Sequence, residues 1–277
     1  MRATAAAVLA VLSLGCGKSD VPDAGPSAPA DPGPQAVAPV CLADPLDASV
    51  DAGWDGGFVF SCRGQQPGAG GQAEFVVTGT TAKAGFTRTA LPGVQVELLT
   101  LEGAVLASTR SGDGGVFRLA FDAGCAPVDG EVRATVLDAD AGFSLSYSAP
   151  EAPWRHDRAG LDLVLFDSST RALAAAIANV TLGDGLAVLA VTVVDCDGHP
   201  VEGAQVVATG DAGVVRYVGA SGLPTTNLTA TGPTGDLVLF NVPGSRVEVT
   251  ATRGGSVIGQ RTVPVHPDAA SGTFLAP

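Results

Sequence analysis

The chain has 277 residues, of which 46% are hydrophobic and 16% are charged, and its mean hydropathy is +0.32. A chain of this composition can bury a core, which argues against a wholly disordered protein. The formal net charge is −13 and the pI is about 4.4. Because phosphate groups repel such an acidic surface, we expect no nucleic-acid partner.

Turn-forming residues occur along the whole chain, with 37 glycines and 19 prolines. Aromatic residues make up only 5%, so we expect a core of Val, Leu, Ala and Phe side chains, a mixture that is typical of strands. Frequent turns between short apolar segments predict an all-β fold.

Residues 1–16 have the features of a secretory signal. One arginine precedes an apolar stretch at residues 3–14, which is too short to span a bilayer. Residues 12–16 (LSLGC) resemble the lipobox of bacterial lipoproteins, in which cleavage exposes a cysteine that carries the lipid. Ser13 departs from that pattern, because leucine is usual three places before the cysteine, and an ordinary signal peptide is the alternative. The resemblance implies that Cys16 is lipidated and that the protein contacts the membrane through this lipid.

The residues after Cys16 bear on the location of the protein. Residue 17 is glycine, whereas Gram-negative lipoproteins that stay in the inner membrane carry aspartate there. By this resemblance we expect a protein of the bacterial cell envelope, anchored in the outer membrane. Residues 17–40 are rich in proline and alanine and are predicted to be a disordered linker.

Residues 41–71 form an acidic loop segment framed by two cysteines. Four cysteines follow Cys16, an even number in a compartment where disulfides persist. Because Cys41 and Cys62 enclose one local loop, we expect them to be bonded to each other. Cys125 and Cys196 would then either form a pair or remain free thiols, and the sequence leaves both possibilities open.

Alternating apolar residues predict strands in two further segments, residues 72–166 and residues 186–277. Val94, Val96 and Leu98 lie on one face of such a strand, and other stretches of both segments follow the same period of two. Turn signals between these stretches favour β-sandwiches. Residues 167–185 connect the two segments and contain a possible helix that Ser168 or Ser169 could cap.

The second segment carries a recognisable series of motifs: DCDGHPVEGAQV at residues 195–206, TAT at 229–231 and GDLVLFNVP at 235–243. This series looks like that of the carboxypeptidase regulatory-like domain, and it covers residues 187–265 well and residues 72–166 more weakly. The resemblance implies two tandem Ig-like, transthyretin-like antiparallel β-sandwiches after the linker. The longer spacing in the second segment predicts an inserted loop at residues 218–226.

Candidate chemical groups are few. His156, His199 and His266 have no partners at a recognised zinc-ligand spacing, and residues 197–199 are interpreted as a turn with an exposed histidine. Aspartate–glycine clusters at residues 51–57 and 113–115 could bind calcium, but they lack the EF-hand order and are interpreted as turns. Residues 219–222 lack the spacing of a serine-hydrolase elbow. We therefore expect no catalytic residue, no cofactor and no metal site.

A loop with Trp154, Arg155 and His156 is the strongest candidate for a binding surface, although a buried, packing tryptophan is the favoured interpretation. Two functional hypotheses follow. The first is a non-catalytic, lipid-anchored envelope protein that acts as a structural or adhesive module, with an unidentified protein or polysaccharide partner. The alternative is an accessory subunit or domain of an envelope peptidase or transport complex.

Overall fold

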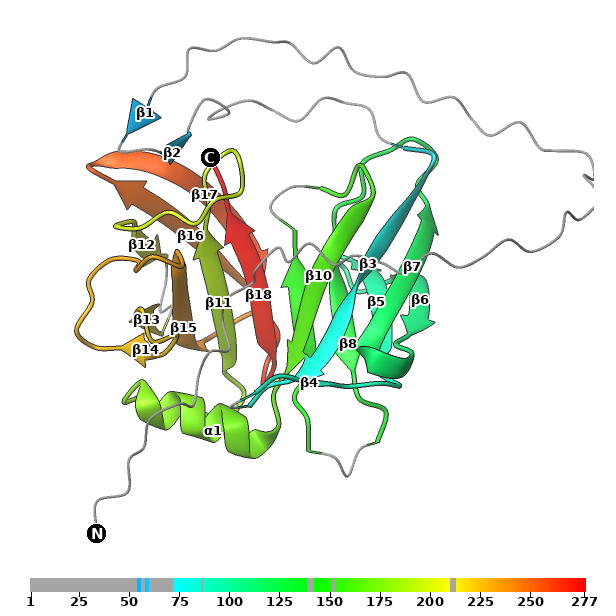
Figure 1. Cartoon of the computed structure of the whole chain (residues 1–277), viewed down its shortest axis with the longest axis horizontal. Coiled ribbons are helices and arrows are strands. Elements are labelled where there is room, and N and C mark those ends of the chain that lie inside the picture. The colour runs from blue at the N-terminus through cyan, green and yellow to red at the C-terminus, as the bar shows by residue number, and fades with distance from the viewer. Residues whose placement is uncertain are drawn as a thin grey trace, which may run out of the picture.

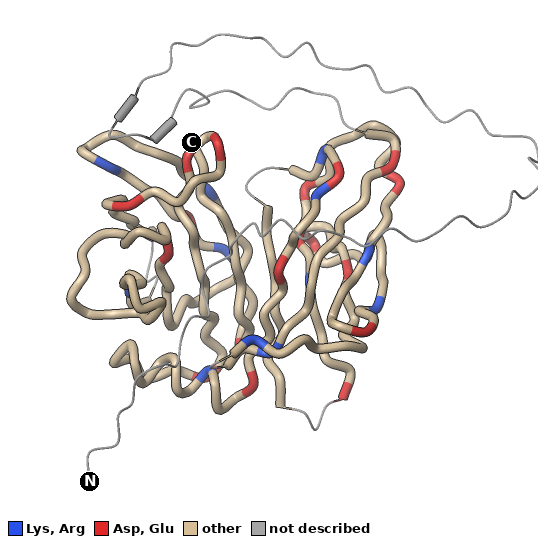
Figure 2. The backbone as a smooth tube through the Cα atoms, in the orientation of Figure 1, with Lys and Arg blue, Asp and Glu red and all other residues tan. Residues whose placement is uncertain are grey.

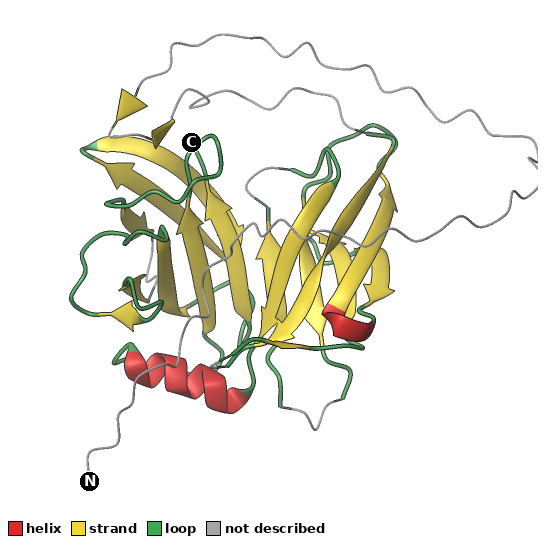
Figure 3. Cartoon of the chain, viewed as in Figure 1, coloured by secondary structure: helices red, strands yellow, loops and turns green. Residues whose placement is uncertain are grey.

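The computed structural model describes residues 72–85, 87–138, 142–150, 153–209 and 213–277, together with the backbone of two short strands near residue 55. Residues 72–166 are called the first half below, and residues 186–277 the second half. Strands form most of the described chain (Figure 3). The strands up to the end of the first half are β1 (Trp54–Asp55), β2 (Phe58–Val59), β3 (Glu74–Lys83), β4 (Thr89–Ala90), β5 (Gln95–Thr100), β6 (Val105–Arg110), β7 (Val116–Asp122), β8 (Gly130–Thr135), β9 (Ser146–Ala149) and β10 (Arg158–Leu165).

Two helices complete the first part of the chain, the 3₁₀ helix η1 (Asp113–Gly115) and α1 (Ser168–Ile177), and α1 leads into the second half. The strands of the second half are β11 (Ala187–Val193), β12 (Gln205–Ala208), β13 (Val214–Val218), β14 (Pro224–Thr225), β15 (Asp236–Val242), β16 (Arg246–Arg253), β17 (Ser256–Pro264) and β18 (Ala270–Leu275). The strands predicted from the alternating pattern are present, and the all-β sandwich class is confirmed. The predicted inserted loop at residues 218–226 contains β14, which pairs with β13.

One nine-stranded sheet runs through both halves, in the order β14-β13-β15-β11-β18-β9-β8-β5-β6 (Figure 1). A four-stranded sheet of β10, β3, β4 and β7 belongs to the first half, and a three-stranded sheet, β12-β16-β17, belongs to the second. β1 and β2 pair with each other. The two sandwiches therefore share one sheet, although the sequence predicts two sandwiches in tandem.

The last strand, β18, joins the two halves. It pairs in parallel with β11 of its own half and in parallel with β9 of the first half. β10 also pairs in parallel with β3. The expectation of purely antiparallel sandwiches is thus wrong for these three strand pairs, because strands far apart in sequence become neighbours and nothing in a hairpin pattern predicts such pairing.

The register shows which face of the nine-stranded sheet each small sheet covers. Val132 lies opposite Ser148, which lies opposite Gly272, and Gly272 lies opposite Ala190. These residues share one face, since paired residues point to the same side. The four-stranded sheet packs on this face over the first half, whereas the three-stranded sheet packs on the other face over the second half. The two small sheets thus cover opposite faces at opposite ends.

Each half has its own hydrophobic core. The first core includes Phe75, Leu98 and Leu163, and the second includes Leu189, Leu239 and Val249. Every member of the first core lies between residues 75 and 165, and every member of the second lies between residues 187 and 275. The predicted connecting segment, residues 167–185, separates these cores in the chain.

Helix α1 connects the two halves and packs on both. Asp167 is its N-cap and accepts a hydrogen bond from the backbone of Thr170 at 2.7 Å. The cap is thus one residue before the serines that the sequence suggested, because an aspartate in extended backbone can accept from the first turn. Ala174 packs beside Ala84 of the first half, and Ala175 packs in a cluster with Phe240 of the second.

Two turns of the second half depend on glycine. Gly198 has a φ of +80°, which agrees with the interpretation of residues 197–199 as a tight turn. Gly235 has a φ of +70°, and a side chain there would come within 2.5 Å of the carbonyl oxygen of Val193. The chain can therefore enter β15 at this angle only with glycine.

Candidate functional site

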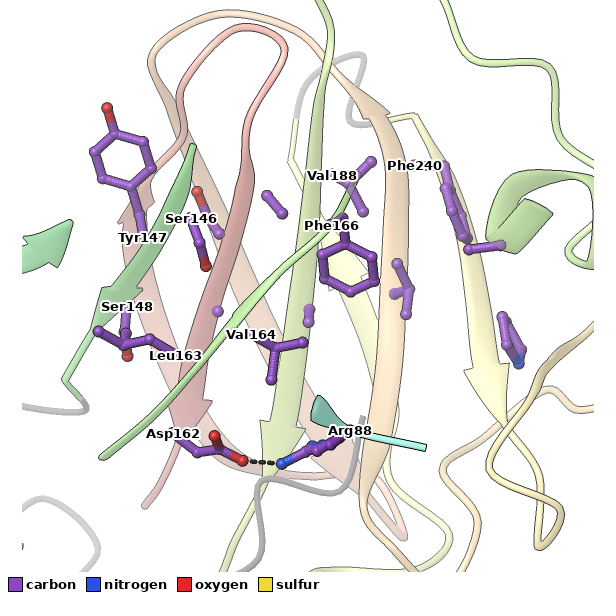
Figure 4. A pocket seen from close by; sticks show the side chains of 17 residues that line it. Arg88, Ser146, Tyr147, Ser148, Asp162, Leu163, Val164, Phe166, Val188 and Phe240 are labelled. Atoms are coloured by element: carbon purple, nitrogen blue, oxygen red, sulfur yellow. Dashed lines mark hydrogen bonds and ion pairs between the residues drawn. The ribbon is translucent and has the colours of Figure 1, made fainter. Parts of the chain in front are cut away.

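A hollow lies at the junction of the two halves, between β10, α1 and the nine-stranded sheet (Figure 4). Its floor consists of small side chains from three adjacent strands, β9, β18 and β11, among them Ser146, Ser148, Ala190, Ala270 and Gly272. On this face the neighbouring strands carry larger residues, which fill the first core on one side and pack with Ala175 of α1 on the other. The hollow therefore exists because the side chains become small where one sandwich meets the other.

Arg88 and Asp162 form an ion pair at one end of the hollow, as the dashed line in Figure 4 marks. Asp162, on β10, also accepts a hydrogen bond from the hydroxyl of Thr80 at 3.2 Å. Burial lowers the pKa of the Arg88 guanidinium. The remaining lining is mostly apolar and includes Val164 and Phe166.

The cavity measures ≈ 80 Å³. Binding pockets for drug-sized ligands usually measure roughly 300–1,000 Å³, whereas a single water needs only about 10–15 Å³. The hollow can therefore hold a few water molecules or one small side chain. The hydroxyls of Ser146 and Ser148 face it and offer hydrogen bonds to such an occupant (Figure 4).

A polar cluster lies on the opposite face of the sheet, beside the same junction. Glu131 on β8 is buried, and its Oε1 lies 2.6 Å from Nε2 of His266. The ring of His266 stacks on Tyr147 with 3.6 Å between the centroids. Arg133 donates to Glu97 at 2.6 Å and hydrogen-bonds Tyr147, whose pKa is raised by burial. His266, which is isolated in sequence, thus has partners from the other half.

The turn after β11 brings together Asp195, Asp197 and His199, with one ligand atom of each within 4.8 Å of the others. This grouping is not among the sites predicted above, although its members alternate along the chain, a spacing that could have revealed it. Asp195 Oδ1 already accepts hydrogen bonds from the backbone of Asp197 at 3.0 Å and of His199 at 2.8 Å. The buried carboxylate therefore shapes the turn, and the exposed His199 side chain agrees with the turn interpretation.

The loop with Trp154, Arg155 and His156 lines a second, open hollow of ≈ 380 Å³. Trp154 is buried in the first core, stacks on Phe75, and donates from Nε1 to the carbonyl oxygen of Gly130 at 3.1 Å. This confirms the interpretation of Trp154 as a packing residue. His156 is exposed on the same loop.

Asp236, at the start of β15, is a buried acid that the sequence analysis did not single out. The residue is 2% exposed, and its Oδ1 accepts a hydrogen bond from the hydroxyl of Thr192 at 2.6 Å. Its Oδ2 has no hydrogen-bond partner among the described residues. Burial raises the pKa of this carboxyl to about 6, against the opposing effect of the hydrogen bond from the Thr192 hydroxyl.

Some predicted site residues lie outside the described residues: the lipidation site Cys16, the pair Cys41 and Cys62, and the aspartates at residues 51–55. Their roles stay predictions. Cys125 and Cys196 are each disulfide-bonded rather than free. The aspartate–glycine cluster at residues 113–115 forms helix η1, which begins the turn into β7.

Among the described residues, no helix combines the length and the apolar character needed to cross a bilayer. No family model matches the chain, and no curated protein matches it. The resemblance to the carboxypeptidase regulatory-like domain therefore rests on the quoted motifs alone.

Several solved structures are similar over about three quarters of the chain. They include the TIE protein of Bacillus anthracis, with 10% identity and a TM-score of 0.25, of which the chain covers 34%. A shaft pilin of Lactobacillus rhamnosus GG has 12% identity and a TM-score of 0.23, and the chain covers 98% of it. A putative cell adhesion protein from Bacteroides ovatus has 10% identity and a TM-score of 0.20, with 91% covered. At such low TM-scores these likenesses carry no information about function.

Proposed function

We propose that this protein is a non-catalytic, lipid-anchored envelope protein whose folded part is a rigid structural or adhesive module. The observation that carries the proposal is the nine-stranded sheet that continues through both cores. A shared sheet couples the halves by backbone hydrogen bonds, so the folded part can present the loops at its two ends in a fixed arrangement.

The junction supports a scaffold more than a reaction centre. The hollow is smaller than a substrate pocket of ordinary size. The ion pairs beside α1 link structural elements. Lys83 pairs with Asp167, and Arg171 pairs with Asp268. Figure 2 shows basic residues beside acidic ones at the end of the molecule where α1 lies. These charges serve to hold α1 against both halves.

The sequence before residue 72 supplies the anchoring part of the proposal. Lipidation of Cys16 would fix the chain to the membrane, and the proline-rich residues 17–40 would hold the sandwiches away from it. Glycine at position 17 favours the outer membrane by the lipoprotein resemblance. A protein or a polysaccharide would then be the partner of the exposed loops.

Replacement of Cys16 by serine tests the anchor. The wild-type protein should fractionate with envelope membranes and partition into detergent, and the Cys16→Ser protein should be released. Adhesion of intact cells to a polysaccharide-coated or protein-coated surface then tests the module, and it should fall in the variant strain. Unchanged fractionation refutes the anchor. Loss of an envelope peptidase or transport activity with unchanged adhesion would favour the accessory-subunit hypothesis instead.

A further inference from the structure

Few apolar contacts hold the two halves together where β9 meets β18. β9 and β18 pair over four residues, from Ser146 opposite Ala270 to Ala149 opposite Thr273. A small apolar cluster of Leu99, Tyr147 and Ala269 adds to this ladder. The other face of the same strands lines the hollow and is left incompletely packed.

The register between β9 and β18 is weakly specified by these contacts. On the hollow side the paired residues are serine, alanine and glycine. A shift by two residues would keep every side chain on its own face. The shift that places Ala270 opposite Ser148 would meet only small side chains of β9 and β18 on the hollow side, whereas the opposite shift would bring Phe274 there. Another contact must therefore select the observed register.

Glu131 and His266 supply such a contact. Glu131 lies on β8, whose antiparallel register with β9 is set within the first half. His266 lies four residues before the start of β18 in the second half. Their side chains meet at 2.6 Å, and the stacked ring of Tyr147 on β9 holds the imidazole from one side. This contact can form in one register only, since a shift by two residues would move His266 along the first half by about 7 Å.

The energetics of the Glu131–His266 pair fit a role in selecting one register between β9 and β18. The Glu131 side chain is 3% exposed, and its Oε2 has no hydrogen-bond partner among the described residues. A buried carboxylate that is only partly satisfied adds little stability, because the loss of hydration offsets the attraction to its partner. The best-attested use of such buried polar groups is to fix register.

We propose that the Glu131–His266 pair is a register pin that sets how the two halves share their central sheet. Arg133 and Glu97 are positioning residues in this arrangement, because their ion pair and the hydrogen bond from Arg133 hold the Tyr147 hydroxyl. The pin acts on the joint between the halves and leaves both hydrophobic cores untouched.

Cross-strand NMR contacts in the full mature chain test the pin directly. The wild type should show contacts between Ala270 and Ser146 and between Thr273 and Ala149. Glu131→Leu should lose these contacts or show a second, displaced set, while the β8–β9 and β11–β18 contacts persist. Glu131→Gln keeps the shape and one hydrogen bond, and should retain the wild-type set.

His266→Leu provides a second test at a less buried position, since the His266 side chain is 30% exposed and that of Glu131 only 3%. It should disturb the β9–β18 contacts in the same way. His199→Leu, in an exposed turn of the same half, is the control and should leave them unchanged. A single wild-type set of contacts in His266→Leu, with only a lower melting temperature, overturns the proposal, and it does so even if Glu131→Leu fails to fold.

Discussion

Asp236→Asn should remove a pH dependence from the stability of the protein. The folded-state pKa of Asp236 is raised from 3.8 to about 6. The stability that its protonated form contributes is therefore complete below about pH 4 and is lost as the pH rises through about 6. A rise of about two pKa units corresponds to about 3 kcal/mol of unfolding free energy between these limits. The neutral amide of asparagine keeps an acceptor for the Thr192 hydroxyl without the buried charge.

Urea unfolding at several pH values between 4 and 8 measures this effect. The difference in unfolding free energy between variant and wild type should change by about 3 kcal/mol across that range in favour of the variant, because other carboxylates titrate in both proteins and cancel. Asp197→Asn, in an exposed turn of the same half, is the matched control and should give a small, constant difference. A constant difference for Asp236→Asn would refute the assignment of the raised pKa to this burial.

Three further tests concern the packing and the capping. Gly272→Ala should raise the unfolding free energy by about 0.5–1 kcal/mol, because the added methyl group meets no atom closer than 3.9 Å, whereas Gly79→Ala should lower it sharply by a clash with the backbone of β10. Val249→Asp should abolish cooperative thermal unfolding, since the residue is 0% exposed in the second core, whereas Val207→Asp at a 63% exposed position should not. Asp167→Ala should cost about 1 kcal/mol at pH 7 through loss of the helix cap. The hydrogen bond from Lys83 holds the pKa of Asp167 well below its usual range, so this difference should decrease as the pH falls below about 4. A difference that is the same at pH 7 and at pH 2 would contradict the reasoning.

The individual strands could be predicted because, within each strand, the alternation of apolar and polar residues follows the alternation of buried and exposed positions. Val94, Val96 and Leu98 alternate with polar residues, and all three are buried in the first core. The sharing of one sheet could not be predicted in this way. β18 begins with four small residues and has only two large apolar ones, Phe274 and Leu275. Its two parallel partners lie far from it in the chain. Local pattern carries no information about such pairing.

Less of the candidate site could be predicted from the sequence. The hollow results from the absence of large side chains on several strands, and that absence has no local signal. Glu131 and His266 are 135 residues apart. The grouping of Asp195 with His199 was predictable from spacing, and the cap at Asp167 was predictable from the preference of aspartate for this position.

The position of β18 between β11 and β9 has a consequence for folding. Until β18 has joined the sheet, β9 and β11 each lack the neighbour that lies between them in the finished sheet. Both would expose unpaired backbone groups during that time, and exposed edges of this kind promote association with other chains. Loss of β18 from its place, for example through proteolysis before Ala270, would therefore open two sheet edges in the middle of the molecule.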